Sequence, residues 1–158
     1  MSTQHSRIVV GVDGTERSVI ALRWAAFEAL QRDAELVAVH AFGSHVRPAP
    51  YAPAGVAPAA TTAAADARAL LDDCVRAAFR HGLPMSIRPV CDVRRPVPAL
   101  LDHGRGATLL VLAGRPDPLH KGVLGAIALD CLRHAPCPVV LVPIAASTAP
   151  SQPIPAHA

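Results

Sequence analysis

Short apolar runs that alternate with segments of helical length are the feature that most constrains how this chain can fold. The runs lie at residues 7–13, 35–42, 85–91, 107–113 and 137–142. Continuous apolar runs of this length are typical of strands buried on both faces of a parallel sheet. The run at 85–91 is kept partly polar by Ser86 and Arg88, which is typical of an edge strand. Consecutive parallel strands need crossovers of helical length, and the segments between the runs provide them. The pattern therefore predicts an α/β fold with one parallel sheet and helices on both of its faces.

The intervening segments carry apolar residues at helical spacing, which predicts helices over 16–32, 62–81, 95–103 and 122–134. Thr15 is the expected N-cap of the first helix, and Gly82 is the expected stop of the second. The residues expected to face the core are Val19, Leu22, Ala26, Ala29 and Leu30 in the first helix, Ala67, Leu70, Leu71, Cys74, Ala78 and Phe79 in the second, and Leu124, Ile127, Ala128 and Cys131 in the last.

The length of 158 residues fits one domain, which we place over residues 1–146. Four prolines between positions 48 and 58 exclude a helix or central strand there, so we expect residues 43–60 to form a flexible, extended connection. The segment after Pro143 contains Ala, Ser, Thr, Gln and Pro, and we expect a disordered tail over 147–158.

Charge and hydropathy argue against several classes of partner. The net charge of +3 comes without a basic stripe interleaved with aromatic residues, so we expect no nucleic-acid binding. No apolar run reaches the length of a membrane span or resembles a signal peptide, so we expect a cytoplasmic protein without a membrane partner. The four cysteines fall within apolar patterns and are expected to be reduced, buried thiols.

Ligands of open parallel sheets bind outside the carboxyl ends of the strands, where the winding reverses. Asp13 and Gly14 follow the first run, Val39 and His40 end the second, and Gly114 follows the fourth. A carboxylate at Asp13 could accept hydrogen bonds from a base or a ribose; the alternative is that it caps the next helix. For His40 a structural role is favoured over contact with a ligand.

The loop after the fourth run combines glycines with cations, namely Gly114, Arg115, His120, Lys121, Gly122 and Gly125. Backbone amides and the dipole at a helix N-terminus attract phosphate, and neighbouring cations add to this. The alternative is a solvated loop in which the glycines form turns. The spacing Cys131-x2-His134-x2-Cys137 lacks a fourth ligand nearby, so no metal is predicted beyond magnesium carried by a nucleotide.

Three segments carry a family resemblance that extends from Arg7 to Pro143. They are Ile8-Val-Val-Gly-Val-Asp-Gly14 with Ser18 following, Leu36-Val-Ala-Val-His40, and Leu132-Arg-His-Ala-Pro-Cys-Pro-Val139. On these residues the chain resembles the universal stress protein family. The resemblance implies a Rossmann-like five-stranded sheet of order 3-2-1-4-5, a homodimer joined through the last strand (Val139 to Val142), and ATP binding in some members.

The resemblance also implies a set of nucleotide-binding positions. They are Gly11, Asp13, Gly14 and Val39 on the adenosine side, and Gly114, Arg115, His120, Lys121, Gly125 and Ala126 on the phosphate side. Nucleotide-binding members carry G-x2-G-x9-G-(S/T) after the fourth strand. Here Ala113 and Pro116 stand at the first two glycines, Gly125 is kept, and Ala126 stands at the hydroxyl position. Arg115, His120 and Lys121 are the candidates to compensate.

The sequence thus predicts a stress-response regulator that binds an adenine nucleotide, ATP in the first place, without evident catalytic machinery. The alternative is a member that has lost ATP binding and acts through protein–protein contacts. A weak nucleotide hydrolase is the least favoured reading, because no general base is evident.

Overall fold

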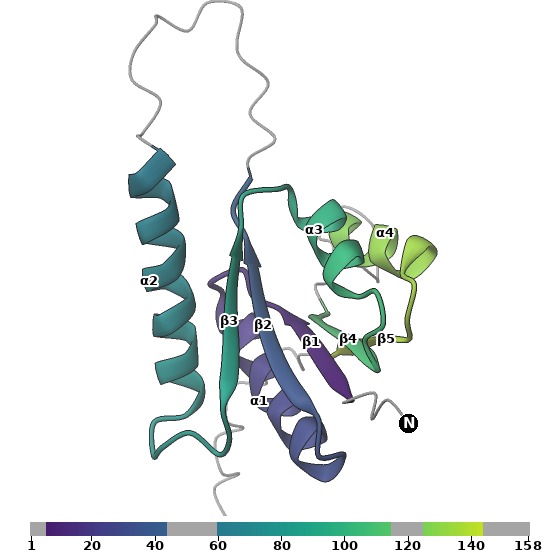
Figure 1. Cartoon of the computed structure of the whole chain (residues 1–158), viewed down its shortest axis with the longest axis horizontal. Coiled ribbons are helices and arrows are strands. Elements are labelled where there is room, and N and C mark those ends of the chain that lie inside the picture. Colours follow the sequence, from purple (N-terminus) through teal and green to yellow (C-terminus); the bar gives the residue numbers. More distant parts are fainter. Residues whose placement is uncertain (1–5, 44–59, 115–124, 144–158) are drawn as a thin grey trace, which may run out of the picture.

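Five strands form one parallel sheet in the order β3-β2-β1-β4-β5 (Figure 1). The structure is a computed structural model that describes residues 6–43, 60–114 and 125–143. The strands are β1 (Arg7–Gly11), β2 (Glu35–Ala41), β3 (Ile87–Asp92), β4 (Leu109–Ala113) and β5 (Val139–Val142). Every neighbouring pair is parallel, so the predicted sheet and its order are confirmed.

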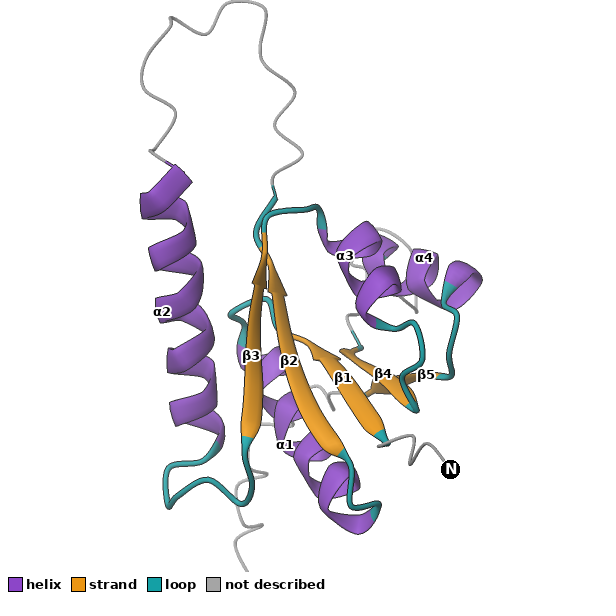
Figure 2. Cartoon of the chain, viewed as in Figure 1, coloured by secondary structure: helices purple, strands orange, loops and turns teal. Residues whose placement is uncertain are grey.

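Two helices cover each face of the sheet (Figure 2). Helices α1 (Glu16–Gln31) and α2 (Ala60–Ala78) lie on one face, and α3 (Pro96–His103) and α4 (Ala126–His134) on the other. In the part of the chain that the structure describes, none of the helices has the length and apolarity needed to cross a bilayer.

The central strand β1 shows why its sequence is continuously apolar. Ile8 and Val10 are fully buried in the core under α1 and α2, whereas Val9 is fully buried in the core under α3 and α4. A strand with helices on both faces has no solvent-facing side, so every position gains from burial.

Two residues predicted to face the core are exposed instead. Leu30 is 48% exposed, because the buried face of α1, made of Leu22 and small residues, ends at Ala29, and the next position lies about 100° around the helix. Ile127 is 42% exposed, because α4 buries Ala128 and Cys131. Leu124, predicted for the last helix, lies outside the described residues. The residues of the second helix that were predicted to face the core are all buried or half-buried.

Element ends differ from the predictions by a few residues, as local hydrogen bonding decides them. The pairing of β3 with β2 begins at Ile87 and ends at Asp92, so Met85 packs against the core without joining the ladder. Strand β5 begins at Val139, after Pro138, which lacks an N–H group to donate. The predicted flexible connection and tail fall almost wholly on residues 44–59 and 144–158, outside the described residues.

Candidate functional site

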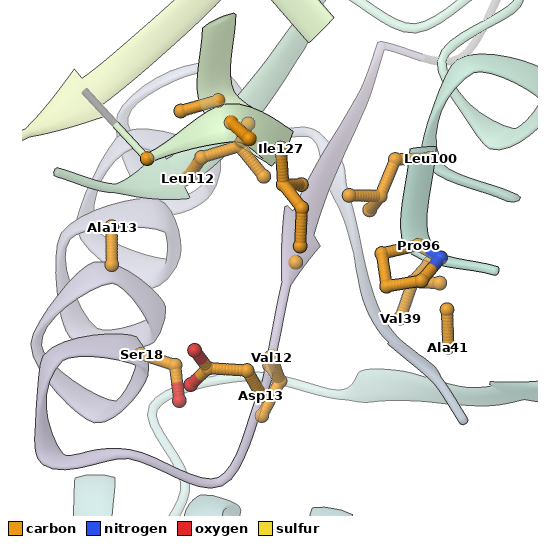
Figure 3. A pocket seen from close by; sticks show the side chains of 14 residues that line it. Val12, Asp13, Ser18, Val39, Ala41, Pro96, Leu100, Leu112, Ala113 and Ile127 are labelled. Carbon is orange, nitrogen blue, oxygen red and sulfur yellow. The ribbon is translucent and has the colours of Figure 1, made fainter. Parts of the chain in front are cut away.

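A cavity of about 310 Å³ opens at the carboxyl ends of β1, β2 and β4 (Figure 3). Strand β1 stands between β2 and β4, and the chain reverses its winding there, which is where ligands bind in folds of this kind. The cavity is lined by Gly11, Val12, Asp13, Ser18, Val39, Ala41, Pro96, Leu100, Leu112, Ala113, Gly125, Ala126, Ile127 and Ala128. Among these, Asp13 and Ser18 carry the only polar side chains.

The polar end of the cavity is built by the turn between β1 and α1. Asp13 Oδ1 accepts hydrogen bonds from the Thr15 N–H (2.9 Å) and the Thr15 hydroxyl (2.6 Å). Thr15 is the N-cap of α1, as predicted, and the buried Ser18 hydroxyl donates to its carbonyl (2.8 Å). Figure 3 shows the side chains of Asp13 and Ser18 together at one end of the cavity.

The hydrogen bonds of this turn control the charge of Asp13. Partial burial by itself would raise the pKa of the carboxyl, but the bonds from Thr15, with Ser18 nearby, outweigh it and hold the pKa below its ordinary value. Asp13 is therefore ionised at neutral pH. It provides a hydrogen-bond acceptor that suits the hydroxyl or amino groups of a ligand.

The first turn of α4 borders the cavity as well. Gly125 is the N-cap residue and offers no side-chain hydrogen bond, and Ala126 carries no hydroxyl. The first amides of a helix have no partner within it, so this border favours an anionic oxygen. The cavity is therefore mostly apolar, and the first turn of α4 gives it one border that suits an anion.

The wall of the cavity formed by the end of β2 and by α3 is apolar, and three of its residues were not among the predicted site residues. Ala41 ends β2, and Pro96 and Leu100 project from α3; Figure 3 shows all three on the same side as Val39. Two signals could have found them. Ala41 is two residues after Val39 and shares its face of the strand, and Pro96 and Leu100 have i, i+4 spacing.

The predicted site residues fall into three groups. Gly11, Asp13, Val39, Gly125 and Ala126 line the cavity. Two others, Gly14 and Gly114, are not in the lining and make structural contacts instead. The backbone of Gly14 has φ +87° and packs against Leu70 of α2, and the Gly114 N–H donates to the Val142 carbonyl (2.9 Å). The candidate cations Arg115, His120 and Lys121 lie outside the described residues.

Gly11 has a packing role as well as a place in the lining. A Cβ atom there would stand 2.8 Å from Leu112 Cδ2, too close for a real Cβ contact, and 3.2 Å from Leu100 Cδ2, which is tight. The glycine therefore allows the two leucines to meet over β1 and form the cavity wall.

A charged cluster fixes α3, and with it the apolar wall. Asp92, at the end of β3, accepts hydrogen bonds from Arg94 Nη2 (2.7 Å) and lies 3.0 Å from His103 Nε2. Arg94 also contacts Asp102 (3.1 Å). The Arg94 side chain and backbone N–H, with His103, hold the pKa of Asp92 well below its usual range despite its burial.

Asp92→Asn is expected to lower the free energy of unfolding by about 2 kcal/mol at pH 7, since charge-assisted hydrogen bonds to a half-buried carboxylate are lost. The folded pKa of Asp92 is depressed, so its stabilisation is complete above the unfolded value of about 3.9 and is lost as the pH falls below it. Urea unfolding should therefore show the gap between wild type and variant narrowing progressively as the pH falls below about 4. Asp73→Asn, which removes an exposed ion pair with Arg76, is the control and should change little. A loss that is constant with pH would contradict this account.

Among the described residues, neither the thiols nor the metal-type side chains form a further site. All four cysteines are free thiols; Cys74 and Cys131 are buried as predicted, whereas Cys91 and Cys137 are only half-buried. Burial raises the pKa of Cys131 to about 11. Within residues 6–43, 60–114 and 125–143, no group of three or more His, Cys, Asp or Glu residues could hold a metal ion.

Comparison with known proteins places the whole described domain in one family. The model of the universal stress protein family matches residues 5–143. Universal stress protein Rv2623 of Mycobacterium tuberculosis is 32% identical over 141 residues, which cover 85% of this chain and 46% of that protein. The chain thus spans about half the length of the curated relatives it matches.

Solved structures agree in fold. A universal stress protein from Archaeoglobus fulgidus in complex with dAMP has a TM-score of 0.59 and 21% identity, covering 88% of this chain and 98% of that one. A universal stress protein in complex with cAMP has a TM-score of 0.51 and 22% identity, covering 87% and 96%. With the family model matching nearly the whole domain and the predicted sheet order confirmed, this chain belongs to the universal stress protein family.

Proposed function

We propose that this protein is a stress-response regulator that binds an adenine nucleotide, including ATP, in the cavity between β1, β2, β4, α3 and α4. The observation that carries the proposal is the lining of that cavity: apolar walls, the ionised Asp13 at one end and the first turn of α4 at its border. A flat, apolar base suits the walls, a ribose suits Asp13, and a phosphate suits the helix N-terminus. The two related structures that hold dAMP and cAMP support the choice of adenine.

Within this proposal the ligand-binding roles divide by position. Val39, with Ala41 and the α3 wall, borders the base. Asp13 accepts from the ribose, while Gly11 and Gly14 shape the strand end and the turn. Gly125 and Ala126 present backbone amides to phosphate. Gly114, Arg115, His120, Lys121 and a magnesium ion carried by the nucleotide complete the proposed phosphate side.

We propose binding without turnover. Of the described residues that line the cavity, Asp13 is the only group able to accept a proton, and two hydrogen bonds from Thr15 already lower its basicity.

Ala126→Asp tests the phosphate end of the site. A carboxylate in the first turn suits the helix dipole, so the fold should tolerate it, but it would repel a phosphate. We expect isothermal titration calorimetry to show affinity for AMP and ATP falling by about 10-fold or more, with adenosine changed less than about 3-fold. The control is Ala64→Asp, the same change at an exposed position on α2. Equal losses for AMP and adenosine would contradict a phosphate at α4.

Separate observations favour a second candidate function, in which the protein acts through protein–protein contacts. Ala113 and Ala126 replace the glycine and hydroxyl of the nucleotide-binding pattern, and α4 leaves Leu129 and Leu132 36% and 42% exposed. The altered nucleotide-binding pattern and the exposed leucines of α4 both favour a family member that acts through protein–protein contacts, including a homodimer through the edge strand β5. No heat with any adenine nucleotide, together with a dimer in sedimentation velocity at micromolar concentration, would favour this function over nucleotide binding.

A further inference from the structure

The turn that carries Asp13 is anchored through both backbone polar groups of Val12. The Val12 N–H donates to the Val39 carbonyl (2.8 Å), and the Val12 carbonyl lies 2.7 Å from His40 Nδ1. Val12 is 4% exposed, so an unpaired carbonyl there would be costly. Two consecutive residues of β2 thus fix the point at which the chain leaves β1 and turns toward α1.

The chemistry of this contact assigns the hydrogen on His40. A carbonyl oxygen only accepts, so Nδ1 must carry the hydrogen and donate it to Val12. The neutral Nδ1–H tautomer and the imidazolium both satisfy this requirement. The bond is short and spans 28 positions of the sequence, which makes it a directional constraint between two strands.

His40 does not act by touching the ligand. Side chains alternate along β2: Leu36 and Ala38 belong to the core under α1 and α2, whereas Val39 and Ala41 line the cavity on the other face. His40 therefore lies on the face away from the cavity. Its side chain reaches the site through the Val12 carbonyl.

The turn is held from a second side by α2. A Cβ atom on Gly14 would stand 2.9 Å from Leu70 Cδ1, so the Gly14 backbone lies directly against that side chain. This contact is apolar and limits how close the turn can come to α2, but it has no direction of its own. The hydrogen bond from His40 to the Val12 carbonyl is directional, as is the bond from the Val12 N–H to Val39.

We propose that His40 is a positioning residue of the nucleotide site: its Nδ1–H holds the Val12 carbonyl and thereby places Asp13 at the end of the cavity. The proposal rests on the proposed function for its ligand. Its effect on the turn, however, exists in the free protein and is measurable there.

The test compares two substitutions of His40 with a remote control. His40→Leu removes the donor, and His40→Asn restores an N–H at a similar distance from the backbone. The control Arg23→Leu removes side-chain donors from the Ala77 and Ala78 carbonyls (both 2.9 Å), a loss of the same kind at the far end of α2. The readouts are AMP affinity by calorimetry and, in the free protein, hydrogen exchange of the Thr15 amide that donates to Asp13.

His40→Leu should weaken AMP binding about 10-fold and speed Thr15 exchange by a similar factor, which corresponds to one lost hydrogen bond. His40→Asn should bring both within about 3-fold of wild type, and Arg23→Leu should lower the melting temperature while changing neither. Unchanged Thr15 exchange in His40→Leu, no rescue by His40→Asn, or an Nε2–H tautomer in nitrogen NMR would each overturn the proposal. If wild type binds no adenine nucleotide, the proposed function fails, and Thr15 exchange alone then decides whether His40 positions Asp13.

Discussion

Replacing Ala41 with Phe is expected to weaken adenine nucleotide binding by about 100-fold or more, beyond detection by calorimetry. Ala41 is the last residue of β2, is half-buried and lines the cavity beside Pro96. Phenylalanine adds a six-carbon ring that must occupy part of a cavity of only about 310 Å³. A ligand cannot share that space, because a wall made of strand and helix does not retreat without cost.

The fold should tolerate this change, since the ring enters a space that is open in the free protein and aromatic residues suit strands. We expect the melting temperature of Ala41→Phe to stay near that of wild type. Ala64→Phe, at an exposed position on α2, is the matched control and should bind normally. Undiminished binding in a folded Ala41→Phe protein would place the nucleotide elsewhere.

Gly43→Ala is expected to lower the free energy of unfolding by about 3 kcal/mol, the upper end of overpacking effects. Gly43 follows β2, and its N–H donates to the Arg94 carbonyl (3.1 Å). A Cβ atom there would stand 2.5 Å from both the Arg94 carbonyl carbon and the Val93 oxygen. These are backbone atoms, so the clash cannot be relieved by a side-chain rotation, and either the turn before α3 or the end of β2 must move.

Gly106→Ala separates this clash from the general effect of replacing glycine. Gly106 has φ +70° and nothing within 4 Å of its missing Cβ, so only the left-handed backbone is penalised, at about 1 kcal/mol. Urea unfolding of both variants measures the difference. Equal losses would show that the close approach of the β2 end to the β3–α3 turn does not constrain Gly43.

The sequence predicted the parts of the fold that neighbouring residues encode. The run at Ile8 to Val12 identified the central strand, because burial on both faces leaves no polar position. Thr15 was recognised as an N-cap from its place before a helical pattern, and its side chain accepts the Ser18 N–H. Leu30 is exposed although the pattern predicts it to face the core, because α1 packs on the sheet through Leu22 and several alanines and its buried face ends at Ala29.

The candidate site was predicted only in part, for a related reason. Asp13 stood out because it ends an apolar run, and it does line the cavity. The α3 wall had only a weak signal: the i, i+4 spacing of Pro96 and Leu100 places them on one helix face, but it does not say that this face borders the cavity until α3 is placed over β1 and β2. The contact of Gly14 with Leu70 was equally invisible, because these residues come from segments more than 50 positions apart.

The sequence by itself determined the alternation of strands and helices, the order of the sheet through its family resemblance, and the turn that bears Asp13. Each follows from periodicity or from motifs of consecutive residues. Tertiary structure alone decided the shape of the cavity, the packing role of Gly11 and the bond from His40 to Val12. Those depend on register and on the distance between packed elements, which no local pattern specifies.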